Sequence, residues 1–556
     1  MKKLSCTGEK ICFFYLLAAL IITFDVNAQD KTRYDKFVQH YVTTQNFMGT
    51  VIVARDNDIL YSKGFGSANL EWNIPNTPNT KFRLGSITKQ FTAASILLLE
   101  ERGKLKIDDP IKKYLLDVPA AWDNITIFNL LTHTSGIPNF TGFPEYQKEK
   151  FTAHTPKQIV DIFRDRPLDF APGEKMSYSN SGYILLGYLL EKVSGETYKS
   201  FLQKNIFDTL GMKDSGYDSN SAVIPRRASG YSPGPAGLLN SEYTDMTIPF
   251  SAGALYSTTE DLLRWEQGLF SGKLLSKESL SKMVTPYKNN YALGVGIRNI
   301  KGHKAIMHGG GIEGFNTQLA CYPDDKLTVV VLSNVNGTTP DQLTDKLAAI
   351  ALGEDAVLPA EKKEITIPVE ILSQYAGTYT LQPRFDLVIT LEGNQLITQA
   401  TGQGKIPVFA ESETKFFVKV VEASIEFFRD KKGTVSHLIL YQNGNELVAR
   451  RSGYVKEPGP VDGTWTGTVD GPDGKPIEVT YVFEGIGKAL LGTMNTSMGG
   501  GPFSEGKIDG NKISFIVRVD QATTIETAGI LSGDVIKMTQ KKGDEVKQFT
   551  VKRVSK

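Results

Sequence analysis

A charged, proline-bearing stretch at residues 354–368 divides the chain into two parts with different hydrophobic patterns. Before it, apolar runs of helical period mix with strand-like runs, which is typical of an α+β domain. After it, short alternating runs such as FDLVITL and KFFVKVV lie between Gly and Asn turns, which is typical of an all-β sandwich or barrel. We therefore predict, in chain order, an α+β domain, a linker, an all-β domain, a second linker and a second all-β domain, at residues 31–353, 354–368, 369–451, 452–463 and 464–556.

The N-terminal segment has the pattern of a secretory signal peptide. Lys2 and Lys3 precede an apolar core from Ile11 to Phe24, and small residues end at Ala28. This core has 14 residues, which is short for a helix that spans a membrane. We predict a signal peptide at residues 1–28 and a secreted or periplasmic protein without a stable membrane anchor after cleavage. The alternative is an uncleaved N-terminal anchor.

Charge and cysteine content exclude several kinds of partner and site. The chain has 62 basic and 61 acidic residues, and 59 of each remain after residues 1–28 are removed. A neutral chain without basic clusters argues against nucleic acid or an anionic membrane surface as the main partner. Cys321 is then the only cysteine, so we expect no intrachain disulfide and a buried, inert thiol. The six histidines show no Glu-flanked pair at metal spacing, and we predict no metal and no cofactor.

Ser86-Ile87-Thr88-Lys89 lies where a polar segment changes into the apolar helical run FTAASILLL. This places Ser86 at a helix N-terminus and Lys89 one turn later on the same face. The positive end of the helix macrodipole favours the negative charge that develops when a serine attacks. A nucleophile with an adjacent base is thereby predicted. Three other Ser-x-x-Lys sequences open no long apolar helix, and they start at Ser279, Ser412 and Ser504.

Two further sequence motifs contain residues that could take part in catalysis or bind a substrate. Tyr178-Ser179-Asn180 precedes a second apolar helix and is suited to shuttle a proton and bind a substrate amide, although the alternative is an ordinary turn tyrosine. Tyr287-Lys288-Asn289 has the same spacing without the following helix. His308-Gly309-Gly310-Gly311 lies between strand-like segments, where glycines allow close approach by a ligand; the alternative is a bulge or turn. A backbone N–H there, paired with that of Ser86, would form an oxyanion hole.

In this order, Ser86-x-x-Lys89, Tyr178-x-Asn180 and His308-Gly309-Gly310 resemble the three motifs of the penicillin-recognising serine hydrolases. These are the class C β-lactamases, D-alanyl-D-alanine carboxypeptidases, D-aminopeptidases and related esterases. The flanking stretches LLTHTSGIP and FAPGEKMSYSNSGYILLG resemble signatures of the same family. The resemblance covers roughly residues 34–352 and implies an antiparallel sheet flanked by helices, with a helical subdomain between about residues 108 and 248. The tail resembles the lipocalin-like extensions of some members.

The resemblance also implies a role for each motif residue. Ser86 is the expected nucleophile, and Lys89 and Tyr178 share the proton transfers. The expected substrate-binding residues are Asn180, His308, Gly309 and Gly310, and the expected oxyanion-hole donors are the backbone N–H groups of Ser86 and Gly311. The expected partner is a small-molecule or peptide substrate.

The third motif departs from the Lys-Thr-Gly or Lys-Ser-Gly of many β-lactamases and penicillin-binding proteins. His308 has an unperturbed pKa of about 6.5 and is largely neutral at pH 7, and Gly309 carries no hydroxyl. Both changes remove groups that would hold a substrate carboxylate. A permanent cation beside Tyr178 would favour its phenolate. Because His308 is largely neutral, stabilisation of the phenolate comes mainly from Lys89. If His308 must be charged, activity should change as His308 titrates, and if it need not be charged, mild acid should have little effect.

His-Gly-Gly resembles the variant found in D-aminopeptidases and esterases of the group. We therefore hypothesise a secreted serine hydrolase that cleaves an amide or ester through an acyl-enzyme, with D-residue or peptidoglycan-type peptides as first candidates and small esters as second. A class C-like β-lactamase is an alternative. A different class of alternative is a catalytically inactive scaffold whose β domains bind a glycan, peptide or lipid, although a binding module has no use for the complete set of motif residues.

Overall fold

The computed structural model describes residues 31–556, except 235–236, 355, 357, 359–361, 383–384, 402–403, 419–422, 431, 443–444, 457, 471–475, 497–498, 519–523 and 543–544. The predicted signal peptide at residues 1–28 lies outside the described residues. The chain divides into two units, Met1–Ala356 and Val357–Lys556. Within the described residues, no helix combines the length and apolar character that crossing a membrane requires.

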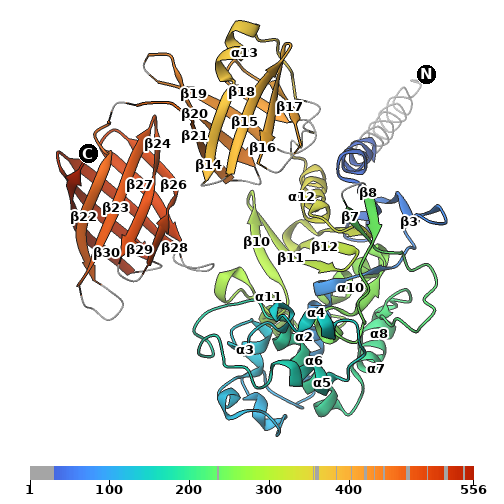
Figure 1. Ribbon diagram of the computed structural model, residues 1–556. Helices are drawn as coiled ribbons and strands as arrows, with labels where there is room; N and C mark the ends of the chain where they lie inside the picture. Colours follow the sequence, from blue (N-terminus) through green and yellow to red (C-terminus); the bar gives the residue numbers. More distant parts are fainter. Residues whose placement is uncertain are drawn as a thin grey trace, which may run out of the picture. The chain divides into compact units, whose positions relative to one another are not determined.

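A six-stranded antiparallel sheet forms the centre of the first unit, with strand order β10-β11-β12-β13-β1-β2 (Figure 1). The strands are β1 (Gly49–Arg55), β2 (Asp58–Phe65), β10 (Gly296–Ile300), β11 (His303–Ile312), β12 (Phe315–Tyr322) and β13 (Leu327–Ser333). The central strand β13 is buried along its whole length, as its β-branched sequence favours. β10 pairs with β11 only as far as Met307. Among the described strands, none pairs with β11 on that side from His308 onward, which leaves a free edge.

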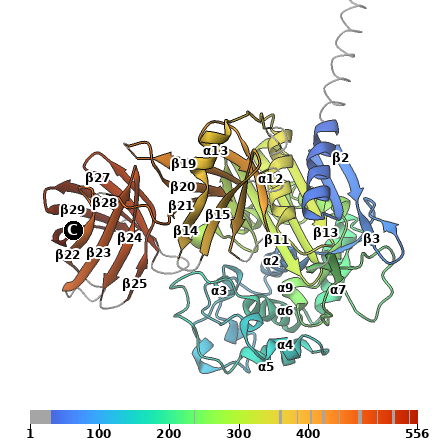
Figure 2. The same cartoon turned by 45° about the horizontal axis from the view of Figure 1, so that its top comes forward.

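Helices cover both faces of this sheet, because alternate residues of a strand point to opposite sides. Val330 and Leu332 join the core that contains α2, α6 and α10, whereas α12 packs against β12 and β13. Figure 2 shows α12 on one side of the sheet and α2, α6 and α9 on the other. Residues 31–45 are also helical. The helices are α2 (Thr88–Glu101), α3 (Ile127–Leu131), α4 (Tyr146–Glu149), α5 (Pro156–Phe163), α6 (Asn180–Ser194), α7 (Tyr198–Leu202), α8 (Asp208–Leu210), α9 (Phe250–Gly253), α10 (Thr259–Phe270), α11 (Lys277–Val284) and α12 (Thr339–Ala351).

The second unit contains a closed eight-stranded barrel, in which β14 pairs with β21 to complete the ring. Tyr375 of the preceding helix α13 (Val369–Tyr375) stacks on Phe427 in the barrel core, with ring centroids 4.3 Å apart. The barrel strands are β14 (Gly377–Gln382), β15 (Phe385–Glu392), β16 (Gln395–Ala400), β17 (Ile406–Ala410), β18 (Lys415–Val418), β19 (Ala423–Arg429), β20 (Val435–Gln442) and β21 (Asn445–Arg451).

The same unit ends in a nine-stranded antiparallel sheet around the fully buried Trp465. Its strand order is β23-β22-β30-β29-β28-β27-β26-β24-β25, and β23 also pairs with β24. The strands are β22 (Gly463–Asp470), β23 (Pro476–Ile486), β24 (Ala489–Thr496), β25 (Gly499–Pro502), β26 (Ser504–Asp509), β27 (Lys512–Arg518), β28 (Thr524–Ser532), β29 (Val535–Lys542) and β30 (Glu545–Ser555).

The predicted fold class is confirmed: an antiparallel sheet with flanking helices is followed by all-β structure that includes a closed barrel. The division between the units falls inside the stretch 354–368, and the other domain limits stay predictions. Cys321 on β12 is a free, buried thiol, and burial raises its pKa well above the usual value, in keeping with the expected inert thiol.

Candidate active site

Ser86 and Lys89 lie where a short 3₁₀ turn, η1 (Gly85–Ile87), leads into α2. Lys89 is fully buried. Its Nζ donates hydrogen bonds to Ser86 Oγ at 3.0 Å, to Asn180 Oδ1 at 2.8 Å and to the Ala252 carbonyl at 2.9 Å. Burial holds the pKa of Lys89 well below its usual value, because the ammonium group loses its hydration there. The serine therefore has a neighbouring amine that is suited to accept a proton.

Tyr178 completes this group from the loop before α6, of which Asn180 is the first residue. Tyr178 keeps 37% of its surface exposed, and its ring centroid lies 4.9 Å from Lys89 Nζ. Burial of its hydroxyl raises the pKa of Tyr178, and a side-chain hydrogen bond with Ser86 opposes that rise. The structure thus brings Ser86, Lys89, Tyr178 and Asn180 together.

The similar sequence Tyr287-Lys288-Asn289 does not supply these groups. Tyr287 is 47% exposed, and Lys288 Nζ donates to two backbone carbonyls at 2.7 Å, those of Gly173 and Glu174. Tyr291, which follows it, enters the site instead, with its hydroxyl 3.0 Å from His308 Nε2. Sequence reasoning missed Tyr291, because the spacing that drew attention to this region starts four residues earlier.

His308 is a buried, neutral residue of β11. Its Nδ1 donates to the Gly309 carbonyl at 2.6 Å, because a carbonyl can only accept, and Nε2 then accepts from the Tyr291 hydroxyl. Burial lowers the pKa of His308 to about 4, with a further decrease from the charge of Lys89 and an opposing hydrogen bond to Gly309. His308 is therefore uncharged at neutral pH, which favours the reading in which its charge is not required.

The pH dependence of activity follows from these two pKa values. A base must be unprotonated to act, so kcat/KM is expected to rise with pH through the pKa of Lys89. Because the pKa of His308 is already about 4, His308→Gln should leave the midpoint of this acidic limb unchanged. We expect the plateau to fall by about fivefold, since Tyr291 loses its imidazole partner. The measurement is kcat/KM against pH for wild type and variant.

His303→Gln is the matched control, because His303 lies on the same strand but pairs with Asp325, at 2.8 Å. His303→Gln should change neither the midpoint of the acidic limb nor the plateau of kcat/KM. If His308→Gln moved the midpoint by about one pH unit or abolished the limb, His308 rather than Lys89 would be the titrating group.

Glycines bring β11 directly beside the turn that carries Ser86. A Cβ on Gly310 would lie 1.9 Å from the Leu84 carbonyl oxygen, so only glycine fits there. Gly85 adopts φ +55°, and its Cβ would lie 2.8 Å from the Gly311 nitrogen. The register of β11 with β12 is unbroken through these glycines, so the alternative of a bulge or turn is wrong. Gly310 is required by the protein's own backbone, and the backbone of Gly311 is held close to Ser86.

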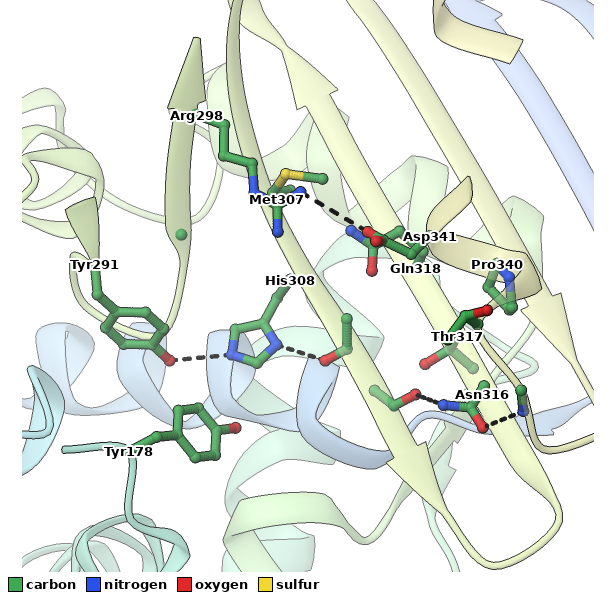
Figure 3. Close-up of a pocket in the computed structure, with 15 residues that line it drawn as sticks. Tyr178, Tyr291, Arg298, Met307, His308, Asn316, Thr317, Gln318, Pro340 and Asp341 are labelled. Carbon is green, nitrogen blue, oxygen red and sulfur yellow. Dashed lines mark hydrogen bonds and ion pairs between the residues drawn. The ribbon is translucent and has the colours of Figure 1, made fainter. Parts of the chain in front are cut away.

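Two cavities reach these residues. One of about 460 Å³ has Tyr178, Tyr291 and His308 at one end and Arg298, Gln318 and Asp341 at the other, as Figure 3 shows. The other, of about 500 Å³, has walls that include Ser86, Asn180 and Gly311. A substrate therefore has room to reach Ser86 within the second cavity.

His133, from the stretch LLTHTSGIP, is a further residue that the sequence did not mark for chemistry. It is buried with φ +57°, and its ring centroid lies 4.2 Å from that of Tyr178. Its Nδ1 accepts from the Ser179 N–H at 3.2 Å. Burial, with smaller contributions from electrostatic interaction with Lys89 and His308, holds the pKa of His133 well below its usual value. A neutral imidazole therefore packs against the ring of Tyr178. Its position within a motif that resembles a family signature was the available signal.

Comparison with known proteins agrees with this geometry. The family model described as Beta-lactamase matches residues 34–354, and that of a domain of unknown function, DUF3471, matches residues 361–451. Penicillin-binding protein 4* of Bacillus subtilis (strain 168) is 33% identical over 436 residues, which is 73% of this chain and 95% of the relative. Teichoic acid D-alanine hydrolase of Staphylococcus aureus (strain MRSA252) is 26% identical over 316 residues, 54% of this chain and 74% of the relative.

A solved structure extends the likeness into the second unit. The octameric penicillin-binding protein homologue from Pyrococcus abyssi has a TM-score of 0.56 and 26% identity, and covers 75% of this chain and 99% of its own. The inactive scaffold that the sequence left open has no support from these relatives. The chain belongs to the beta-lactamase family and is a serine hydrolase related to the penicillin-binding proteins.

Proposed function

We propose that Ser86 forms an acyl-enzyme with Lys89 as its base. The observation that carries this proposal is the fully buried Lys89 amine, with its depressed pKa, 3.0 Å from Ser86 Oγ. Neutral Lys89 accepts the Ser86 proton while Oγ attacks the substrate carbonyl carbon. The bond from this carbon to the leaving nitrogen or oxygen then breaks, and the acyl group stays on Oγ. Attack by water releases the acid and restores Ser86.

Tyr178 is the proposed proton donor to the leaving group, and the proton that Lys89 took from Ser86 then passes to Tyr178, which restores both groups before water attacks. Its raised pKa keeps the hydroxyl protonated at neutral pH, and its hydrogen bond with Ser86 places it at the reacting atoms. The backbone N–H groups of Ser86 and Gly311 are the proposed oxyanion hole, in which each donor contributes on the order of 3 kcal/mol. Asn180 is proposed to bind the substrate amide. Its Oδ1 accepts a hydrogen bond from Lys89, which holds the Asn180 side chain in place at the site.

The proposed substrate is a D-residue or peptidoglycan-type peptide in the first place and a small ester in the second. A neutral His308 and a Gly309 without a hydroxyl supply no charged anchor for a substrate carboxylate, which supports this class over a β-lactam. The name of one relative, a teichoic acid D-alanine hydrolase, is consistent with a D-residue substrate. We also propose that the protein is secreted or periplasmic, which the pattern of residues 1–28 supports.

A matched substrate panel tests this proposal. It contains D- and L-alanine p-nitroanilide, p-nitrophenyl butyrate and a chromogenic cephalosporin. We expect the D-anilide or the ester to have the highest kcat/KM, and the cephalosporin to be hydrolysed at least about tenfold less efficiently because it relies on a carboxylate anchor. Preferential cephalosporin turnover would contradict the substrate class, and the L-anilide exceeding the D-anilide would contradict the chirality.

A further inference from the structure

The cavity beside Ser86 has one charged wall. Its described lining residues are neutral apart from Glu313, which lies in the turn between β11 and β12. The side chain of Glu313 is 23% exposed. Because Ser86, Gly311 and Glu313 line the same cavity of about 500 Å³, a substrate acylating Ser86 can meet the carboxylate with its acyl part.

The ion pairing around Glu313 leaves negative charge at this wall. Among the described residues its ion-pair partner is Lys150, at 3.6 Å, whereas Lys150 approaches Glu242 to 2.5 Å. One buried ammonium group thus faces two carboxylates, and the longer contact belongs to the carboxylate that lines the cavity. The negative charge of Glu313 affects Tyr146, which lines the same cavity. Burial, and to a smaller extent the charge of Glu313, raises the pKa of Tyr146 to about 12.

We infer that Glu313 binds the protonated amino group of the substrate's acyl part, so that this enzyme prefers aminoacyl amides or esters to their N-acylated counterparts. A carboxylate that is incompletely paired in a partly enclosed cavity attracts a cation more strongly than one in open water. A substrate ammonium can donate a hydrogen bond to Glu313, because the 3.6 Å contact with Lys150 is longer than a hydrogen bond. The inference rests on the proposed function of Ser86 and narrows its substrate class to compounds with a free amine.

The rival reading is structural: Glu313 serves only to neutralise Lys150. Glu242 already neutralises Lys150 at a shorter distance. A purely structural role for Glu313 also does not explain why its side chain lines the cavity that contains Ser86. The two readings differ in what happens to substrates with and without a charged amine, which makes them separable by kinetics.

The test compares D-alanine p-nitroanilide with N-acetyl-D-alanine p-nitroanilide at about pH 6.5, where an α-amino group is protonated. Wild type should prefer the free amine, and Glu313→Gln should reduce the ratio of the two kcat/KM values by about tenfold through the amine substrate alone. The ratio in wild type should also fall as pH rises past about 8, where the amine loses its proton, and this fall should vanish in Glu313→Gln. Any effect of the substitution on catalytic steps that both substrates share cancels in the ratio of the two kcat/KM values.

Glu145→Gln is the matched control, because Glu145 precedes Tyr146 but pairs with Arg166, at 2.8 Å, and does not line the cavity. It should leave the ratio unchanged within about twofold. Labelling of Ser86 by a fluorophosphonate reports serine chemistry independently of the amine. If wild type is labelled at Ser86 but shows no preference for the free amine, or if the ratio is unchanged in Glu313→Gln, the inference about Glu313 is overturned while the proposed function stands. A wild type that does not label overturns the proposed function and the inference with it.

Discussion

Ser86→Ala is expected to lower kcat/KM for the best substrate of the panel by about 10⁵-fold, because no acyl-enzyme can form. The oxyanion-hole geometry should persist, since it is set by the backbone of η1 and β11 and by the contact of Gly310 with Leu84. The thermal midpoint should therefore stay close to that of wild type. The measurement is steady-state kinetics together with thermal unfolding followed by circular dichroism.

Ser279→Ala serves as the control for this variant, because Ser279 starts another Ser-x-x-Lys sequence on α11. Its activity should remain within about twofold of wild type. Retention of more than about one per cent of activity in folded Ser86→Ala would show that another group is the nucleophile.

Lys89→Met is expected to reduce kcat/KM by about 10³- to 10⁴-fold, because the base that receives the Ser86 proton is lost. Methionine has a similar length and fills the buried space without a charge. The carbonyl of Ala252 and Oδ1 of Asn180 each lose a donor, but the cost of burying a polar amine disappears as well, so we expect a folded protein. The rate of fluorophosphonate labelling should fall with kcat/KM.

Lys288→Met is the control of the same residue type, since Lys288 also donates to backbone carbonyls but belongs to the Tyr287-Lys288-Asn289 sequence. It should keep near-wild-type kinetics. A folded Lys89→Met protein that retained a tenth of the activity, with Lys288→Met impaired instead, would contradict the assignment of the base.

Those parts of the site that are encoded locally could be predicted from the sequence. Ser86 and Lys89 lie within one turn at the start of an apolar helix, and Tyr178 immediately precedes another helix, so short-range patterns sufficed to pick them out. The alternating runs after residue 368 likewise indicated all-β structure. That the three motifs meet in space followed from family resemblance, because no local pattern specifies a contact between residues more than two hundred positions apart.

Features created by tertiary packing could not be predicted. Tyr291 reaches His308 across the site, and His133 supports Tyr178 from a loop that the sequence marked only by resemblance. The ordinary pKa of a histidine is about 6.5, whereas burial lowers that of His308 to about 4, and burial depends on neighbours that the sequence does not place. For the same reason, nothing in the sequence distinguished Glu313 from the other surface carboxylates.

Mass spectrometry of the inhibited enzyme tests the central claim most directly. The protein is treated with a fluorophosphonate, or with the best ester substrate and acid quenching, and then digested with trypsin. Cleavage after Arg83 and Lys89 releases the peptide Leu84–Lys89, in which Ser86 is the only serine. The account predicts one adduct on Ser86 in this peptide, absent from Ser86→Ala. An adduct on any other residue, or turnover by a wild type that forms none, would contradict it.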